Sequence, residues 1–271
     1  MSDEEEGFAG DLFGAEEASP PPPEPTFEIY ERDPRFLDEQ SGNIKQLNIR
    51  LVGSHPLWAH HLWNASKVFA SFFDENKDIV RNRTVLELGA GGALPSLIAA
   101  ANGAAKVVIT DYPDAELIDN IRYNVATNNL MDDERVNVQG YIWGTSTDKL
   151  EQQLPEGQST FDVIILSDLV FNHSQHHAML STCRKLLTPN TGRAYVFYTH
   201  HRPHLAHKDL EFFNIARRPY SKDIDPDDRE AMGYGFEVDH FIQKKMHVMF
   251  EEDPGDVETR ATVHGWQLWI L

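Results

Sequence analysis

Apolar runs alternate with segments of helical periodicity over most of the chain. Continuous short apolar runs are typical of strands buried on both faces of a parallel sheet. Such runs predict five strands, at 85–88, 106–110, 136–138, 161–167 and 193–198. Helical spacing predicts helices at 93–102, 113–128, 174–188 and 205–217, and two further strands, 235–242 and 260–270, close the chain. Five parallel strands and a closing antiparallel hairpin predict an α/β fold, with a seven-stranded, mostly parallel sheet and helices on both faces.

The part of the chain before residue 84 predicts an N-terminal arm followed by one amphipathic helix. Apolar residues over 44–51 indicate a strand or an extended arm laid against the domain. The helix extends through Phe72, and Trp58 and Trp63 lie in the segment that introduces it. Because this segment precedes the first buried strand, we expect it to lie across the mouth of a binding site. Each tryptophan taken alone is also compatible with a place in the core.

A glycine turn follows the first buried strand and marks the predicted ligand site. Gly89 and Gly91 let the backbone turn tightly and let a ligand approach main-chain N–H groups, because no Cβ stands in the way. The second strand leads into Asp111, about 20 residues further on, where a carboxylate can accept hydrogen bonds from both hydroxyls of a ribose. The dinucleotide fingerprint needs a third glycine where this chain has Leu94, which favours S-adenosylmethionine over NAD.

The ends of the later strands carry further candidates, because open α/β sheets bind ligands at their carboxyl edge. Trp143 follows the third strand and is compatible either with stacking on adenine or with core packing. Ser167 and Asp168 follow the fourth apolar run, and Asp168 is the leading candidate for a chemical role, with a helix cap as its structural alternative. The histidine-rich segment 200–207 follows the fifth strand. It has no cysteine partners and no HExxH pattern, so we expect no metal site.

Composition limits the partners and the compartment. The 271 residues carry 24 basic and 43 acidic side chains, and the formal charge of −19 disfavours nucleic acid or an anionic membrane and favours a basic partner. Residues 1–26 contain eight acids, no lysine or arginine and four consecutive prolines, so we expect a disordered tail before a single domain over 27–271. The single Cys183, with no basic leader and no membrane-spanning apolar run, predicts a cytoplasmic protein, which we expect to be a monomer.

Several motifs together resemble one protein family. They are Ser54-His-Pro-Leu-Trp58, Leu62-Trp-Asn-Ala65, Val85-Leu-Glu-Leu-Gly-Ala90, Thr110-Asp-Tyr-Pro-Asp114, Gly140-Tyr-Ile-Trp-Gly144 and Leu166-Ser-Asp-Leu-Val-Phe-Asn-His173. Across residues 45–215 the chain resembles the fungal elongation-factor methyltransferases that were formerly labelled nicotinamide N-methyltransferase-like. These are similar to the wider class I, seven-strand lysine methyltransferases. The predicted order of strands and helices is the one that a class I methyltransferase requires.

The resemblance implies S-adenosylmethionine as cofactor and assigns roles to the residues that match the family's motifs. A tryptophan before the first strand, either Trp58 or Trp63, is implied to contact the cofactor. The other implied cofactor contacts are Gly89, Ala90, Gly91, Asp111, Trp143 and Ser167. The Asp-x-x-Phe motif implies a catalytic part for Asp168 and Phe171. Relatives often have tyrosine at the second position, and phenylalanine there removes the hydroxyl.

The resemblance also implies the substrate: the N-terminal glycine amine and the adjacent lysine of translation elongation factor 1-alpha. Methyl transfer is an in-line displacement, so the protein mainly positions donor and acceptor and excludes water. The amine must be neutral to attack, which is easier for an α-amine with a pKa of about 7.7–8 than for a lysine at about 10.4. We expect Asp168 to orient the amine and to receive its proton directly or through water. Two alternatives stay open, a methyltransferase for a small amine such as nicotinamide and a cofactor-binding interaction module with little catalysis.

Overall fold

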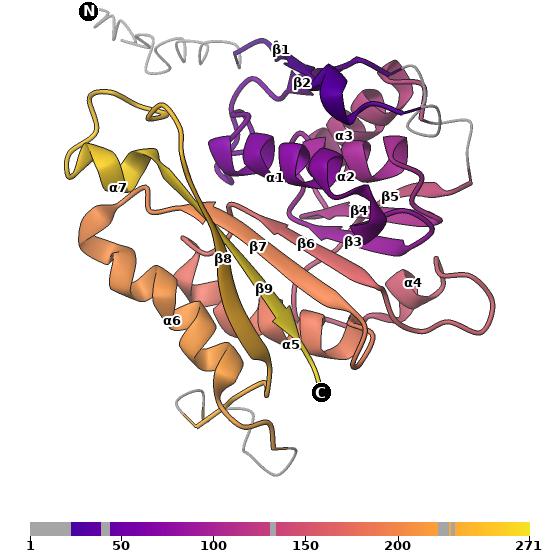
Figure 1. Ribbon diagram of the computed structural model, residues 1–271, viewed down its shortest axis with the longest axis vertical. Coiled ribbons are helices and arrows are strands. Elements are labelled where there is room, and N and C mark those ends of the chain that lie inside the picture. The colour runs from indigo at the N-terminus through magenta and orange to yellow at the C-terminus, as the bar shows by residue number, and fades with distance from the viewer. Residues whose placement is uncertain (1–22, 39–43, 131–133, 222–227, 229–230) are drawn as a thin grey trace, which may run out of the picture.

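A seven-stranded sheet with the order β5-β4-β3-β6-β7-β9-β8 forms the centre of the protein (Figure 1). This computed structural model describes residues 23–38, 44–130, 134–221, 228 and 231–271. The strands are β3 Thr84–Leu88, β4 Lys106–Asp111, β5 Val136–Gly140, β6 Val163–Ser167, β7 Arg193–Thr199, β8 Glu237–Lys245 and β9 Thr262–Trp269. Strands β3 to β7 pair in parallel, and β9 pairs antiparallel with β7 and with β8. The predicted α/β fold with its closing hairpin is therefore confirmed.

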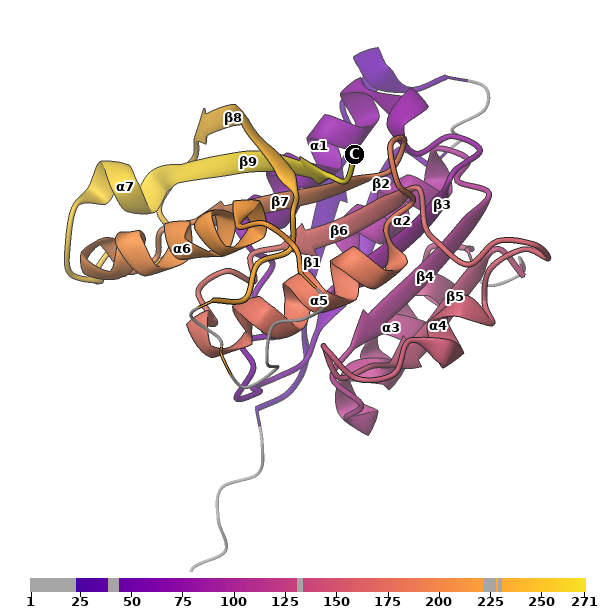
Figure 2. The same cartoon turned by 90° about the horizontal axis from the view of Figure 1, so that it is seen from below.

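The structure adds the strand order of the closing hairpin and corrects where its second strand begins. Its second strand, β9, lies inside the sheet next to β7, while β8 forms the edge, as the strand order in Figure 2 shows. The expected strand over 260–270 begins only at Thr262, because a short helix, α7 Val257–Ala261, comes first. Asp256 caps this helix, since its side chain accepts a hydrogen bond from the Thr259 N–H at 2.7 Å.

Helices cover both faces of the sheet, as predicted (Figure 1). They are α1 Asn64–Glu75, α2 Leu94–Ala101, α3 Ala115–Thr127, α4 Asp148–Glu151, α5 His176–Leu186 and α6 Ala206–Arg217. Successive side chains of a strand point to opposite faces, so Val85 packs with α1, α2 and α3 while Leu86 packs with α4, α5 and α6. In the part of the chain that the structure describes, no helix combines the length and apolar character needed to cross a membrane.

The N-terminal arm is a separate sheet of two antiparallel strands, β1 Thr26–Glu31 and β2 Gln46–Leu51. The strand expected within 44–51 is confirmed. Its partner β1 was not predicted, because its apolar residues Phe27 and Ile29 are more than 60% exposed and give no signal of burial. The expected tail over 1–26 falls mostly on residues 1–22, which lie outside the described part, and β1 already begins at Thr26.

Asparagine side chains of α3 and of its C-cap residue, Asn128, occupy the free edge of β2. Asn128 accepts from the Asn48 N–H and donates to the Asn48 carbonyl, both at 2.9 Å. One turn earlier, Asn124 accepts from the Arg50 N–H at 2.8 Å and donates to the Arg50 carbonyl at 2.9 Å. Asn124 also donates to the carbonyl of Gly92 at 3.1 Å, so the arm is tied directly to the glycine turn.

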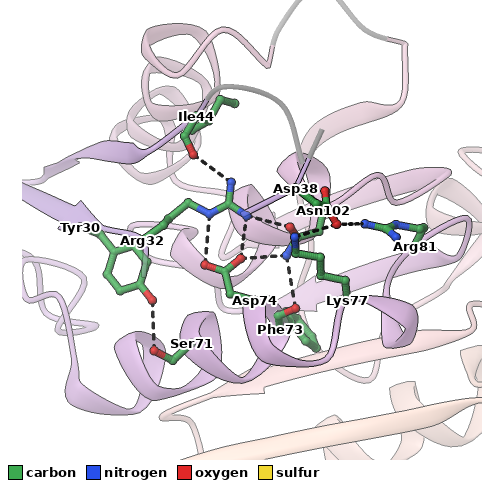
Figure 3. Close-up of polar contacts among 10 residues, drawn as sticks. All are labelled: Tyr30, Arg32, Asp38, Ile44, Ser71, Phe73, Asp74, Lys77, Arg81 and Asn102. Atoms are coloured by element: carbon green, nitrogen blue, oxygen red, sulfur yellow. Dashed lines mark hydrogen bonds and ion pairs between the residues drawn. The ribbon is translucent and has the colours of Figure 1, made fainter. Parts of the chain in front are cut away.

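A buried ion pair anchors the arm to α1 (Figure 3). The Arg32 guanidinium donates to both carboxylate oxygens of Asp74, at 3.1 and 2.7 Å, and the two side chains are 0% and 2% exposed. Arg32 also donates to the side-chain oxygen of Asn102 at 2.7 Å and to the Ile44 carbonyl at 3.0 Å. Since β2 leads directly into residues 53–63, this cluster positions the segment that the sequence placed over the binding site.

Candidate active site

A cavity of about 870 Å³ opens at the carboxyl ends of the parallel strands. Every residue that the sequence assigned to a site lies on its wall: Trp58, Trp63, Gly89, Ala90, Gly91, Asp111, Trp143, Ser167, Asp168 and Phe171. Strand order explains this convergence, because β3 lies between β4 and β6 and all three end at the same edge. The sequence thus located the cavity wall, while the role of each residue stays a prediction.

The glycine turn has the conformation that its glycines permit. Gly89 and Gly91 have φ values of +60° and +53°, a region that favours glycine. At Gly89 space is also short, since a Cβ would lie 2.8 Å from the Leu169 side chain and 2.9 Å from the Trp143 ring. At Gly91 the nearest such atom, the Cα of Ala59, is 4.0 Å away. The turn at Gly91 therefore leaves its backbone open on the cavity side.

Asp111 supports this turn as well as lining the cavity. One of its carboxylate oxygens accepts from the Gly91 N–H and the other from the Tyr112 N–H, both at 2.7 Å. Burial raises the pKa of Asp111, although these two hydrogen bonds oppose the shift. Each carboxylate oxygen has a second lone pair, so both can still accept from a ribose hydroxyl. The predicted ribose-binding role fits this geometry.

The tryptophans form an aromatic wall: Trp58 and Trp63 both line the cavity, so a cofactor contact by either one stays a prediction. Trp58 is 50% exposed, and its carbonyl accepts a hydrogen bond from the Trp63 indole N–H at 3.3 Å. Trp143 lines the cavity and also packs against the core, while its stacking on adenine stays a prediction. None of the three is a purely internal core residue.

Asp168 is held at the cavity wall by the neighbouring strand. Its φ of +58° lies in the left-handed region, and its N–H donates to the Phe197 carbonyl at 2.7 Å. Both carboxylate oxygens lie 3.0 Å from Nε2 of His201, and one lies 3.4 Å from the Thr199 N–H. The helix-cap alternative is wrong, because the next helical turn begins only at His173.

His201 is the functional candidate that sequence reasoning did not single out. It lines the cavity, pairs with Asp168, and meets the ring of Trp63 edge-on at 4.8 Å between centroids. Burial lowers the pKa of His201, but the nearby carboxylates of Asp168, Asp209 and Asp253 together outweigh this effect, so the pKa is raised overall. The only sequence signal was its place directly after a strand, which it shared with the other histidines of 200–207.

The histidine cluster is divided between two carboxylates. His200 donates through Nδ1 to one oxygen of Asp209 at 2.7 Å, and His173 contacts the other oxygen at 2.7 Å. Neither His200 nor Asp209 lines the cavity. Over the described ranges, no three histidine, cysteine, aspartate or glutamate side chains are placed to hold a metal ion.

The loop between β8 and α7 supplies a further wall that the sequence did not predict. Phe250 lines the cavity and packs edge-on against His61 at 5.1 Å and Trp63 at 6.0 Å. Asp253 lines the cavity as well, and the two acids between them, at 251 and 252, are exposed. This loop follows an edge strand far along the chain, so no local pattern linked it to the glycine turn.

Comparison with known proteins gives a consistent result. Residues 43–218 match a family model described as lysine methyltransferase. The chain is 42% identical to EFM7 of Cryptococcus neoformans, named a protein N-terminal and lysine N-methyltransferase, over 99% of this chain and 91% of that protein. Proteins of the same name from Schizosaccharomyces pombe and Neurospora crassa are 42% and 39% identical, over 83% and 95% of this chain and 83% and 87% of their own lengths.

Solved structures with the same fold are more distant in sequence. A crystal structure of a transferase candidate from Pyrococcus horikoshii superposes with a TM-score of 0.51, covers 83% of this chain and 70% of its own, and is 14% identical. At this level of identity the likeness concerns the fold alone.

Proposed function

Because the chain belongs to the lysine methyltransferase family, we propose that it methylates the N-terminal glycine amine and the adjacent lysine of translation elongation factor 1-alpha in the cytoplasm. The chain is a class I methyltransferase that uses S-adenosylmethionine and acts on protein N-terminal and lysine amines. Motif resemblance over residues 45–215 supports the elongation-factor substrate. The observation that carries the proposal is a single cavity shared by the glycine turn and the Asp168 carboxylate.

The residues of the cavity fit S-adenosylmethionine, which supplies an activated sulfonium methyl group. Asp111 has free lone pairs for the ribose hydroxyls, and the Gly91 backbone is open on the cavity side. The buried hydroxyl oxygen of Ser167 has no hydrogen-bond partner among the described residues, which leaves it available to a polar group of the cofactor. The faces of Trp58, Trp63 and Trp143 suit both an adenine ring and a sulfonium cation.

The charge of the cavity mouth fits a basic peptide. Asp253 and Asp168 lie on the wall together with Arg202, exposed acids at 251 and 252 precede Asp253, and the whole chain carries a formal charge of −19. A glycine amine followed by lysine brings positive charge, so electrostatic attraction would favour its approach. A neutral small amine such as nicotinamide gains nothing from this arrangement. The rim therefore supports a protein substrate over the small-molecule alternative.

The protein's own part in the reaction is positioning and exclusion of water. Trp63, Phe171 and Phe250 wall the cavity with apolar surface, which keeps water from the reacting groups. Phe171 acts only through this surface, because it has no hydroxyl. The Asp168 carboxylate orients the incoming amine, which must lose its ammonium proton before it can attack.

Transfer of labelled methyl groups to recombinant elongation factor 1-alpha with a free N-terminal glycine tests the proposal. Mass spectrometry of the N-terminal peptide should locate the label on the glycine amine and the adjacent lysine. A factor with an acetylated N-terminus should accept label only on lysine. The variant Asp111→Asn should bind S-adenosylmethionine more weakly, because an amide has only one oxygen acceptor for the turn and the ribose together.

The controls separate the alternatives. Label in nicotinamide and none in the factor would overturn the elongation-factor proposal in favour of the small-molecule alternative. Cofactor binding without transfer to any amine would favour the interaction module. Label confined to internal lysines of other proteins would keep the enzyme class and refute the substrate.

A further inference from the structure

We propose that His201 is the group that accepts the proton of the substrate ammonium, and that Asp168 positions His201 for this task. The inference rests on the proposed function, since it concerns the same cavity and the same amine substrate. It reassigns the proton step that sequence reasoning gave to Asp168, because the structure pairs that carboxylate with His201, which is the more exposed of the two side chains.

The geometry assigns the two nitrogens of His201 different tasks. Nε2 lies 3.0 Å from both oxygens of Asp168. A carboxylate only accepts, so Nε2 carries the proton of the neutral ring and the lone pair is on Nδ1. Among the described residues, Nδ1 has no hydrogen-bond partner. The side chain is 20% exposed and lies on the cavity wall, whereas Asp168 is only 3% exposed. His201 is therefore the more accessible member of the pair.

The surroundings make His201 a stronger base than a free imidazole. Asp168 from the end of β6, Asp209 from α6 and Asp253 from the loop before α7 all act on His201 and raise its pKa against the effect of burial. Arg202 is adjacent in sequence, and its guanidinium donates to the Phe171 carbonyl at 3.1 Å. Trp63, which packs against the His201 ring from the start of α1, carries no charge.

The proton step balances without any further reactant. The N–H bond of the substrate ammonium breaks, a bond forms between that proton and Nδ1, and the amine keeps the electron pair. The amine nitrogen then bonds to the transferred methyl carbon as the carbon–sulfur bond of the donor breaks. The imidazolium that results is paired with Asp168 and returns its proton to solvent through the exposed cavity. Transfer to lysine gains most from this base, because a free lysine ammonium has a pKa of about 10.4 and keeps its proton at neutral pH.

His200 provides a matched internal control. It neighbours His201 and also pairs with an aspartate, Asp209. Its side chain points away from the cavity, which it does not line, and packs against Tyr198 at 5.0 Å between ring centroids. Substitution of His200 by glutamine should affect stability but not the proton step. Glutamine at position 201 keeps an N–H donor for Asp168, because its amide nitrogen corresponds to Nε2, and at both positions glutamine removes the imidazole base.

The experiment measures single-turnover methyl transfer against pH with S-adenosylmethionine saturating, for wild type, His201→Gln and His200→Gln. The substrates are two peptides with the elongation-factor N-terminus, one with a free and one with an acetylated glycine. We expect His201→Gln to slow transfer to lysine by about 10²–10⁴-fold at neutral pH, the usual contribution of a general base. The rate of the His201→Gln variant should then rise tenfold per pH unit, because the lysine ammonium must lose its proton to solvent without a base. The affinity for the cofactor should stay unchanged.

Transfer to the α-amine should suffer less, because its reference pKa is about 7.7–8. If His201→Gln retains the wild-type rate and pH profile, the inference is wrong and Asp168 or water takes the proton. An equal loss in His200→Gln would mean that the histidine segment acts only through folding. If wild type transfers methyl groups to neither peptide, the proposed function fails, and the inference with it.

Discussion

Replacing Arg32 with methionine should destabilise the N-terminal arm and, through it, the cofactor cavity. The Arg32 side chain is completely buried and makes two hydrogen bonds to Asp74, one to Asn102 and one to the Ile44 carbonyl (Figure 3). Methionine has a similar length, so the change removes the charge and the donors more than it removes volume. The Asp74 carboxylate would keep only the Asn102 amide, at 2.9 Å, as a described hydrogen-bond partner.

The size of the effect follows from the burial of the pair. Removing one partner of a buried ion pair costs about 3–5 kcal/mol, because the other charge stays in the interior uncompensated. Domains of this kind have a free energy of unfolding of about 5–15 kcal/mol, so the loss is a large fraction of the total. Replacing both side chains, as Arg32→Met with Asp74→Leu, should recover most of the loss, since no charge then stays buried.

Urea denaturation followed by circular dichroism measures the free energy of unfolding of both single variants and of the double variant. Calorimetry gives the affinity for S-adenosylmethionine, which should fall in Arg32→Met, because Asn124 couples β2 to the carbonyl of Gly92. If Arg32→Met lowers the free energy of unfolding by less than about 1 kcal/mol, the pair contributes no more than an exposed ion pair does, and the reasoning is refuted. So would a double variant that is no more stable than the single ones.

Three further predictions concern the glycine turn, a buried acid and the charge of the rim. Gly89→Ala should lower thermal stability and cofactor affinity more than Gly91→Ala, because both have positive φ but only at Gly89 would the Cβ meet atoms within 3 Å; melting curves and calorimetry compare them. Burial raises the pKa of Glu87 to about 8 from 4.5, so unfolding releases its proton between these values. The free energy of unfolding should therefore fall by about 1.4 kcal/mol for each unit that the pH rises within that window. Urea titrations at pH 5 and pH 8 should show this fall in wild type and not in Glu87→Gln. Finally, kcat/KM for the basic protein substrate should fall as salt is added, while that for a neutral amine should not.

Much of the site followed from the sequence because its signals are local. The apolar runs of β3 and β6 read as strands without knowledge of their neighbours, since each is buried on both faces. The glycines of the turn and Asp111 stand at strand ends, and a parallel sheet brings such ends to one edge whatever its further details. For the same reason Trp143 and Ser167 were placed on the correct wall.

The parts of the site that the sequence did not predict depend on contacts between segments that lie far apart in the chain and share no motif. Asp168 meets His201 only because β6 and β7 are adjacent, and His200 and His201 diverge because successive residues at a strand end point to opposite sides. Phe250 reaches the cavity from the far edge of the sheet. The sequence by itself determined the fold, which rests on periodicity, and the cofactor edge, which rests on residues that directly follow buried strands. Only the tertiary structure decided which histidine pairs with Asp168 on the cavity wall, because that pairing depends on side-chain direction and on contacts across the sheet.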